Sequence, residues 1–208
     1  MKVLMLNGSP HEKGCVFTAL SEVASELEKY GVESEIFQMG KKPVMGCISC
    51  NACAKTGKCF YNDDRVNECA EKLREADAFI IGSPVYYAGP NGALCAFLDR
   101  LFYSSRGYEG KPGACVVNCR RGGASAAFDR LNKYFTISNM PVIPSQYWNS
   151  THGRTPEQVK LDFEGMQTMR TLAKNTAWML QTLSAKEHPG YEKHIYTDFI
   201  PRIHNQPR

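Results

Sequence analysis

The chain has 208 residues, 43% of them hydrophobic and 22% charged, which is an ordinary composition for one globular domain with a substantial core. Its net charge of +4 is small and its basic residues are scattered, which argues against a protein that binds nucleic acid. Nine cysteines, an odd number, argue against a disulfide framework, and no apolar run suits a signal peptide or a membrane span, so we expect a cytoplasmic protein without membrane association.

Short apolar runs and amphipathic segments alternate along the chain. Consecutive apolar residues are typical of buried parallel strands, and apolar residues three or four apart are typical of helices. The first half is predicted to contain a strand at 2–7, a helix at 16–30, an edge strand at 32–39, a cysteine-rich insertion at about 44–62, a helix at 66–73 and a strand at 78–82. The second half is predicted to contain a helix at 94–101, a strand at 114–118, a helix at 128–135, a strand at 140–143 and one long helix from 155 to 180. The pattern then ends, and residues 184–208 are predicted to be a tail that is either mobile or docked on a partner subunit.

Five strands that alternate with helices predict an α/β domain over residues 1–183, with a parallel sheet and helices on both of its faces. Ligands of such sheets bind in the crevice beyond the carboxyl ends of the strands. The loops that follow the three apolar strands are therefore expected to meet at one edge of the sheet. The cysteine-rich insertion follows the second strand and is expected at that edge too.

The loop after the first strand, from Gly8 to Cys15, leads into the start of a helix, where backbone N–H groups and a hydroxyl could bind an anion such as phosphate. The loop lacks the Gly-Lys-Ser/Thr ending of a P-loop, and no G-x-G-x-x-G follows the strand. Nucleoside triphosphates and Rossmann-type dinucleotides are therefore disfavoured. The alternative is an ordinary turn between a strand and a helix.

The loops after the two later apolar strands suit an aromatic ligand. Ser83-Pro84-Val85-Tyr86-Tyr87 is rigid at its proline and carries two aromatic side chains, which could line a flat ring or simply cover the core. Arg120 and Arg121, beside Gly122 and Gly123, could place a cation near an electron-rich heterocycle or could simply be solvated.

Four cysteines in one short segment are the strongest sign of redox or metal chemistry. Cys47, Cys50, Cys53 and Cys59 form two C-x2-C steps followed by C-x5-C, which brings four thiolates within reach of one metal centre, as in the compact cysteine sets of iron–sulfur proteins. Zinc is a rival, although zinc ribbons place their cysteine pairs farther apart, and free or exchanging thiols fit as well. From the spacing alone, all three interpretations remain open.

Three of these loops together resemble a known family. The Gly8-Ser9-Pro10 loop, the G-S-P-V-Y-Y run at 82–87 and the R-R-G-G run at 120–123 look like the NADPH-dependent FMN reductase and iron–sulfur flavoprotein branch of the flavodoxin superfamily. The resemblance covers roughly residues 1–183 and implies a flavodoxin-like three-layer sandwich with five parallel strands in the order 2-1-3-4-5.

The resemblance also implies the cofactors and the residues that bind them. FMN would be held by Ser9, His11, Gly14, Cys15 and Val16 at its phosphate, by Pro84, Val85, Tyr86 and Tyr87 along its isoalloxazine ring, and by Asn118, Arg120, Gly122 and Gly123 at the far edge of the ring. The insertion is similar to the cluster motif of the iron–sulfur flavoproteins, so a [4Fe–4S] cluster, if present, would be held by Cys47, Cys50, Cys53 and Cys59.

The chain departs from the family pattern in its first loop. Relatives commonly have arginine where His11 stands and Asn-Thr where Cys15 and Val16 stand, so a fixed positive charge and two hydrogen-bonding side chains are missing. FMN is therefore expected to be held more weakly or more by the backbone. Many family members also keep some of the cysteines without an evident cluster.

No serine, histidine and carboxylate arrangement stands out near the loops, so no catalytic side chain is predicted and the cofactor is expected to carry the chemistry. The leading prediction is an FMN-dependent oxidoreductase that takes hydride from NAD(P)H and passes electrons to a small molecule or a protein. One alternative is an FMN electron carrier reduced by a partner such as ferredoxin. Another is a thiol-redox or metal-binding module without flavin. The resemblance further implies a homodimer or homotetramer.

Overall fold

Five parallel strands form the centre of the protein. In a computed structural model that describes residues 1–184, 188–193 and 195, they lie in the order β2-β1-β3-β5-β6. Their bounds are Glu33–Gln38 for β2, Lys2–Asn7 for β1, Ala78–Tyr86 for β3, Gly113–Cys119 for β5 and Ser150–His152 for β6. A two-residue strand, β4 (Gly89–Pro90), pairs antiparallel with the end of β3. Counted along the parallel strands alone, the order is the predicted 2-1-3-4-5.

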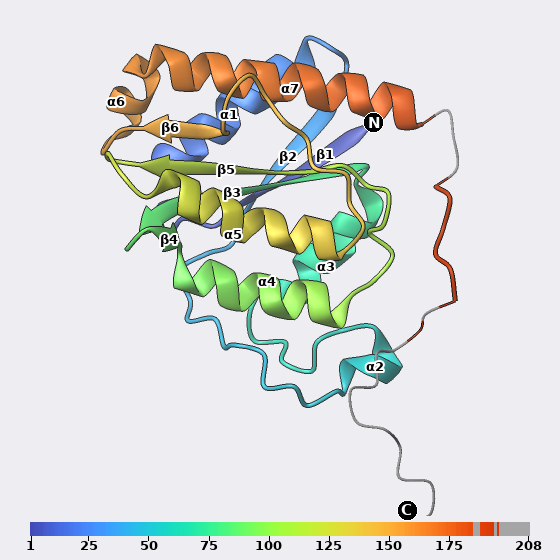
Figure 1. The fold of residues 1–208 in the computed structure, drawn as a ribbon. Coiled ribbons are helices and arrows are strands. Elements are labelled where there is room, and N and C mark those ends of the chain that lie inside the picture. The colour runs from blue at the N-terminus through green and yellow to red at the C-terminus, as the bar shows by residue number, and fades with distance from the viewer. Residues whose placement is uncertain (185–187, 194, 196–208) are drawn as a thin grey trace, which may run out of the picture.

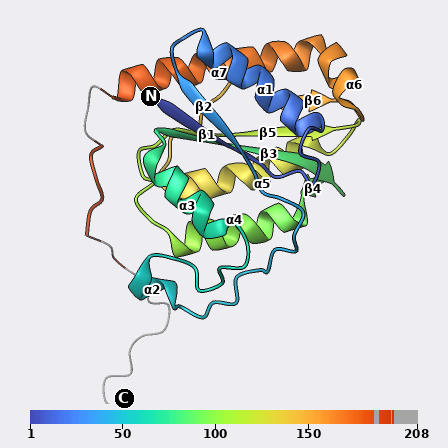
Figure 2. The same ribbon diagram turned by 180° about the vertical axis from the view of Figure 1, so that it is seen from behind.

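Helices cover both faces of this sheet (Figures 1 and 2). One face carries α1 (Cys15–Glu28) and α7 (Phe163–Leu183), and the other carries α3 (Val66–Glu75), α4 (Gly92–Ser104) and α5 (Ala124–Ile137). Successive side chains of a strand point to opposite faces, so β1 supplies both cores. Leu4 and Leu6 pack on the side of α3, α4 and α5, whereas Val3 and Met5 pack on the side of α1 and α7.

The fifth strand lies later in the sequence than predicted. Residues 140–143 form only one bridge, between Val142 and Gly113, and the regular pairing with β5 is made by β6. The prolines explain the difference, since Pro141 and Pro144 have no N–H to donate and interrupt a strand on either side of this bridge.

The single long helix predicted from 155 to 180 is two helices, α6 (Pro156–Leu161) and α7. The break is at Asp162, whose backbone is not helical and whose Oδ1 accepts a hydrogen bond from the Gly165 N–H at 3.0 Å. Aspartate satisfies a free amide at a helix start better than it continues a helix, so the chain restarts there.

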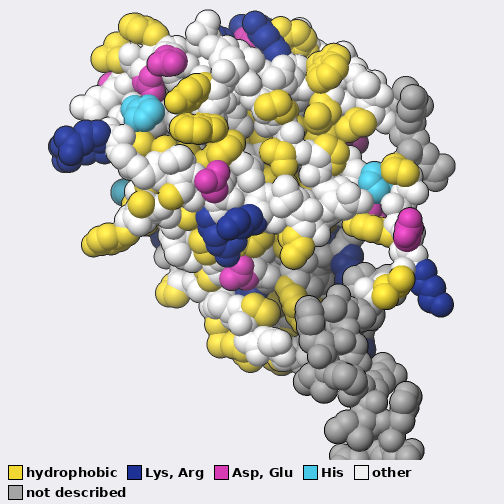
Figure 3. Space-filling model, viewed as in Figure 1, with side chains coloured by type: hydrophobic (Ala, Val, Ile, Leu, Met, Phe, Trp, Pro, Cys, Tyr) yellow, Lys and Arg dark blue, Asp and Glu magenta, His cyan; other side chains and the backbone are white. Residues whose placement is uncertain are grey.

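Charged side chains of both signs lie close together on the face shown in Figure 3, without a continuous band of lysine and arginine across it. No helix in the described part of the chain is long and apolar enough to span a membrane. The predicted tail at 184–208 falls mostly outside the described residues.

Candidate functional site

The carboxyl ends of the central strands bring the predicted loops together. Asn7, the last residue of β1, is level with Gly82 of β3, and Pro84 of β3 is level with Asn118 of β5. The Asn118 Nδ2 donates to the backbone oxygen and the hydroxyl of Thr151 on β6, at 3.1 and 3.0 Å. The loops after β1, β3 and β5 therefore meet at one edge, as predicted.

The residues predicted to bind FMN differ in their solvent exposure at this edge. Buried are Ser9, Val16 and Asn118; half-buried are Gly14, Cys15, Pro84, Val85 and Gly123; exposed are His11, Tyr86, Tyr87, Arg120 and Gly122. The edge thus has a fixed floor with exposed aromatic and cationic side chains around it.

The first loop is shaped by side chains of two neighbouring strands. The Asn7 Oδ1 accepts from the Ser9 N–H at 3.1 Å, and the Gln38 side chain donates to the Ser9 carbonyl at 2.7 Å. Asn7 and Gln38 also bond to each other at 2.6 Å. The Ser9 Oγ accepts from the His11 N–H at 3.1 Å, which leaves the Ser9 hydroxyl hydrogen free for a ligand. Gln38 was not among the predicted residues, because its partner is 31 residues away.

The start of α1 fits an anion. Gly14 stands at the N-cap and provides no side-chain hydrogen bond, so the N–H groups of Cys15, Val16 and Phe17 have no intrahelical acceptor. The first turn holds no acidic residue that would compete for them. Burial raises the pKa of the Cys15 thiol, so this side chain adds no negative charge at neutral pH. Free amides and the helix dipole together favour a phosphate here.

The segment predicted to be a loop from Ser83 onward forms a β-hairpin. Strand β3 continues to Tyr86, turns through Tyr87 and Ala88 with φ values of 50° and 58°, and returns as β4. Two consecutive left-handed residues match the twist of a tight hairpin, which the sequence pattern of Gly and Pro did not reveal. Tyr87 is fully exposed at the tip, and Tyr86 is 45% exposed.

The hairpin and the loop after β5 touch at Gly123. This residue has a φ of +89°, and a Cβ placed on it would lie 2.8 Å from the Ala88 Cα and 3.1 Å from the Val85 side chain. Only glycine allows this approach without displacement. The two loops predicted to enclose the flavin ring are therefore packed against each other.

Asn91, just before α4, is the central connection that sequence reasoning missed. Its Nδ2 donates to the Gly8 carbonyl at 2.8 Å, its Oδ1 accepts from the Ala93 N–H at 3.0 Å, and its own N–H donates to the Ser83 hydroxyl at 3.1 Å. One buried residue thus ties the first loop, the hairpin strand and the start of α4 together. An asparagine directly after the Gly-Pro pair was the available signal for a helix cap.

The four cysteines line a pocket at the other end of α4. Cys47, Cys50, Cys53 and Cys59 share this pocket with Arg100, Tyr103 and Ser104 of α4. A helix rises about 1.5 Å per residue, so Arg100 lies roughly 14 Å along the axis from Asn91. The prediction that the insertion lies at the ligand edge is therefore wrong. The segment instead runs along α4 to the short helix α2 (Cys53–Thr56), as Figures 1 and 2 show.

Side chains from two helices hold this segment in place. Asn67 of α3 binds both backbone groups of Cys59: its Oδ1 accepts from the Cys59 N–H and its Nδ2 donates to the Cys59 carbonyl, each at 2.9 Å. The Tyr103 hydroxyl donates to the Asn51 side chain at 2.8 Å. Ser49 and Asn51 have left-handed φ values of 55° and 57° on either side of Cys50, a turn that this packing maintains.

The pocket has donor groups suited to a metal–sulfur centre. Four sulfurs line it, the Arg100 Nε donates to the Cys59 Sγ at 3.2 Å, and the Ser104 Oγ is buried in its wall without a hydrogen-bond partner. Within the described residues, no three His, Cys, Asp or Glu side chains converge closely enough to ligate a single ion.

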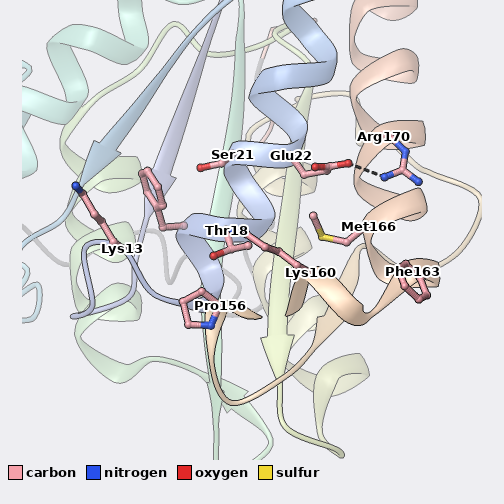
Figure 4. A pocket seen from close by; sticks show the side chains of 10 residues that line it. Lys13, Thr18, Ser21, Glu22, Pro156, Lys160, Phe163, Met166 and Arg170 are labelled. Carbon is pink, nitrogen blue, oxygen red and sulfur yellow. Dashed lines mark hydrogen bonds and ion pairs between the residues drawn. The ribbon is translucent and has the colours of Figure 1, made fainter. Parts of the chain in front are cut away.

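A separate hollow of about 530 Å³ lies between α1, α6 and α7 (Figure 4). Its lining includes the apolar Met166 and Phe163 and an ion pair in which the Arg170 guanidinium donates to the Glu22 carboxylate at 2.5 Å. Of the loop before α1 it touches only Lys13. None of the predicted FMN residues, all of which the structure describes, lines this hollow, so it is distinct from the strand edge.

Comparison with known proteins identifies the family. A family profile described as NADPH-dependent FMN reductase matches residues 1–155. An iron–sulfur flavoprotein of Methanocaldococcus jannaschii is 32% identical over 192 residues, which cover 88% of this chain and 99% of that protein.

Solved structures agree on the fold. RosB, solved with a bound riboflavin-phosphate intermediate, superposes with a TM-score of 0.72 at 16% identity, over 99% of this chain and 95% of RosB. A flavodoxin from the domain Archaea superposes with a TM-score of 0.59 at 15% identity, over 87% of this chain and 99% of the flavodoxin. The fold is therefore flavodoxin-like, and the profile match together with the nearly full-length relative shows that the chain belongs to the NADPH-dependent FMN reductase family and is akin to its iron–sulfur flavoproteins.

Proposed function

We propose that the protein is an FMN-dependent oxidoreductase that binds the FMN phosphate at the start of α1. The observation that carries this proposal is the uncapped helix start, with three free amides and no acid in the first turn. The Ser9 hydroxyl would donate to the phosphate, together with the amides of Cys15, Val16 and Phe17. Because His11 is exposed and makes no side-chain contact that orders it, the backbone supplies most of the binding.

The isoalloxazine ring would lie along the strand edge, against the continuous wall that the hairpin and the loop after β5 form together. Pro84, Val85, Tyr86 and Tyr87 would line it, with Asn118, Arg120, Gly122 and Gly123 at its far edge. The contact of Gly123 with the hairpin supports this placement, because it brings the two loops together without a ligand. The exposed Tyr87 side chain would control access to the ring.

When bound, FMN accepts a hydride and passes electrons on singly or in pairs. The electron donor that the family description favours is NAD(P)H. The chain's own contribution is to orient the flavin and to place backbone donors and Arg120 near it, since no acid–base side chain of the described edge is fixed against the ring position. The final acceptor would be a small molecule or a protein.

The cysteine pocket would hold a [4Fe–4S] cluster on Cys47, Cys50, Cys53 and Cys59. What supports this is that the four cysteines line one pocket, since cysteine thiolates are the ligands that iron–sulfur clusters use. When bound, such a cluster transfers one electron at a time.

The phosphate site can be tested with two flavins and two variants. Riboflavin lacks the phosphate, so we expect it to bind at least a hundredfold more weakly than FMN. Gly14→Asp places a carboxylate at the helix start, and Gly14→Ala adds the same Cβ without a charge. Gly14→Asp should bind FMN at least tenfold more weakly than Gly14→Ala, with riboflavin binding equal in both. Equal affinity for FMN and riboflavin in the unaltered protein would rule out this site.

The electron donor is tested by the visible spectrum of anaerobically purified protein before and after addition of NADPH. Bleaching of the flavin bands by NADPH supports a reductase. Bleaching by dithionite alone supports a second candidate, an electron carrier reduced by a protein partner, which the exposure of Cys47 and Cys50 favours. A protein that binds no FMN would leave only the thiol-redox or metal-binding module.

A further inference from the structure

Arg100 is buried beside the cysteine pocket. The proposed flavin site at the strand edge does not explain why a charged side chain is buried there. Its side chain is 1% exposed, although it is charged and lies on α4 among apolar neighbours. A guanidinium removed from water in this way is destabilising unless its donors are matched by acceptors.

Each N–H group of Arg100 has an acceptor. The Nη1 donates to the Asp64 carboxylate and to the Met45 carbonyl at 3.3 Å, and the Nη2 donates to the Tyr61 carbonyl at 2.9 Å and to the other Asp64 oxygen at 3.3 Å. The fifth N–H, on Nε, donates to the Cys59 Sγ at 3.2 Å. Four contacts fix the guanidinium plane, so the fifth donor is aimed at the sulfur.

The backbone that carries this sulfur is also held in place. Asn67 holds the backbone of Cys59 at both its N–H and its carbonyl, which keeps Cys59 beside Arg100. A neutral thiol is a weak acceptor, whereas a thiolate that ligates a metal accepts a charge-assisted hydrogen bond. Of the described residues that line the pocket, Arg100 alone carries a positive charge.

We propose that Arg100 is a positioning residue that raises the reduction potential of a cluster on the four cysteines through its hydrogen bond to Cys59. Hydrogen bonds to the sulfurs and the local charge set the potential of such clusters. The bond draws electron density from the sulfur and so stabilises the state that has gained one electron. This inference rests on the proposed function, because it requires a cluster.

The experiment is a potentiometric titration with dithionite, followed by the electron paramagnetic resonance of the reduced cluster. Arg100→Lys keeps the charge but loses the planar donor. The double variant Arg100→Gln with Asp64→Asn removes both charges, so the local net charge is unchanged and no buried ion is left unpaired. We expect both to favour the oxidised cluster by about tenfold, which is about 59 mV for a one-electron couple.

The matched control is Arg74→Lys. Arg74 also holds the insertion, by donating to the Gly57 carbonyl at 3.0 Å, but it contacts no cysteine sulfur. It should leave the potential unchanged. A wild-type potential in both Arg100 variants, at full iron content, would overturn the inference. Absence of iron and sulfide from the unaltered protein would instead overturn the proposed cluster itself.

A measurement on the unaltered chain covers the case in which the variants lose the cluster. Protein labelled with ¹⁵N-arginine should show a ¹⁵N coupling to the reduced cluster in pulsed resonance spectra, transmitted across the N–H···S bond. A loaded cluster without such a coupling would contradict the role of Arg100, whatever the variants show.

Discussion

Replacing Asn91 with alanine is expected to weaken both the fold and FMN binding, because this one side chain joins the first loop to α4. The change removes the N-cap of α4, which costs about 1 kcal/mol, and leaves the buried Gly8 carbonyl without its donor, which costs about 1–3 kcal/mol. The free energy of unfolding should therefore fall by about 2–4 kcal/mol. For a domain of this size each kcal/mol lowers Tm by about 2–4 °C.

FMN binding should fall in parallel, because Gly8 and Ser9 would no longer be held in the conformation proposed to bind the phosphate. FMN must then order the loop that the hydrogen bond from Asn91 no longer holds. The loss of one hydrogen bond is worth about 1.4 kcal/mol, which corresponds to about a tenfold increase in Kd. The assays are urea denaturation of the flavin-free protein and titration of FMN fluorescence.

Asn91→Ser separates the two roles of the side chain. Serine can still cap α4 through its hydroxyl oxygen, but it is too short to donate to the Gly8 carbonyl. It should therefore recover about 1 kcal/mol of stability and leave FMN binding as weak as in Asn91→Ala. The reasoning would be refuted if Asn91→Ala unfolded within about 0.5 kcal/mol of the unaltered protein, or if it bound FMN with unaltered affinity.

Three further predictions concern the loops, the helix break and the sheet edge. Gly123→Ala should lower the free energy of unfolding by about 1–3 kcal/mol, because its φ is left-handed and its Cβ would strike the hairpin, whereas Gly122→Ala, whose Cβ meets open space, should be nearly neutral in the same denaturation assay. Asp162→Ala should cost about 1–2 kcal/mol, because the N–H groups of Gly165 and His152 both lose their acceptor, and thermal unfolding of Asp162→Asn, whose single amide oxygen can accept from only one of them, should fall between those of Asp162→Ala and the unaltered protein. A hydrogen bond from Lys72 holds the pKa of Glu35 below its ordinary value of 4.5, so the stability it contributes is complete above pH 4.5 and is lost as the pH falls through the lowered pKa. Denaturation of Glu35→Gln between pH 7 and pH 3 should show a flatter pH dependence, and an unchanged slope would contradict this assignment.

The meeting of the loops at the strand edge could be predicted because it follows from local rules. An apolar run that ends in Gly8 or Gly82 specifies a strand and its exit, and parallel topology then brings the exits together. The boundaries of the helices and strands were harder to predict, because they depend on single residues that can either continue a helix or cap one. Asp162 reads as one polar position of a long helix, yet it begins a new helix by capping it.

The location of the cysteines could not be predicted, because it depends on partners distant in sequence. Their spacing shows that the four thiols can share a centre, but not where the segment lies. Arg100 is 41 residues from Cys59. From the sequence alone it would be expected on the exposed face of its helix, whereas in the structure the insertion buries it. Asn67 likewise reads as an exposed helix residue, although it clamps the backbone of Cys59.

The insertion contributes little to the two cores of the domain, although the partly buried Val44 packs against one of them. Residues 40–63 include no fully buried side chain, and the short helix within them buries none. The cores of the α/β domain are therefore built mainly by residues outside the segment that carries the four cysteines. The proposed cluster would then be added to a domain that has already folded, and loss of the cysteines would leave the α/β fold in place.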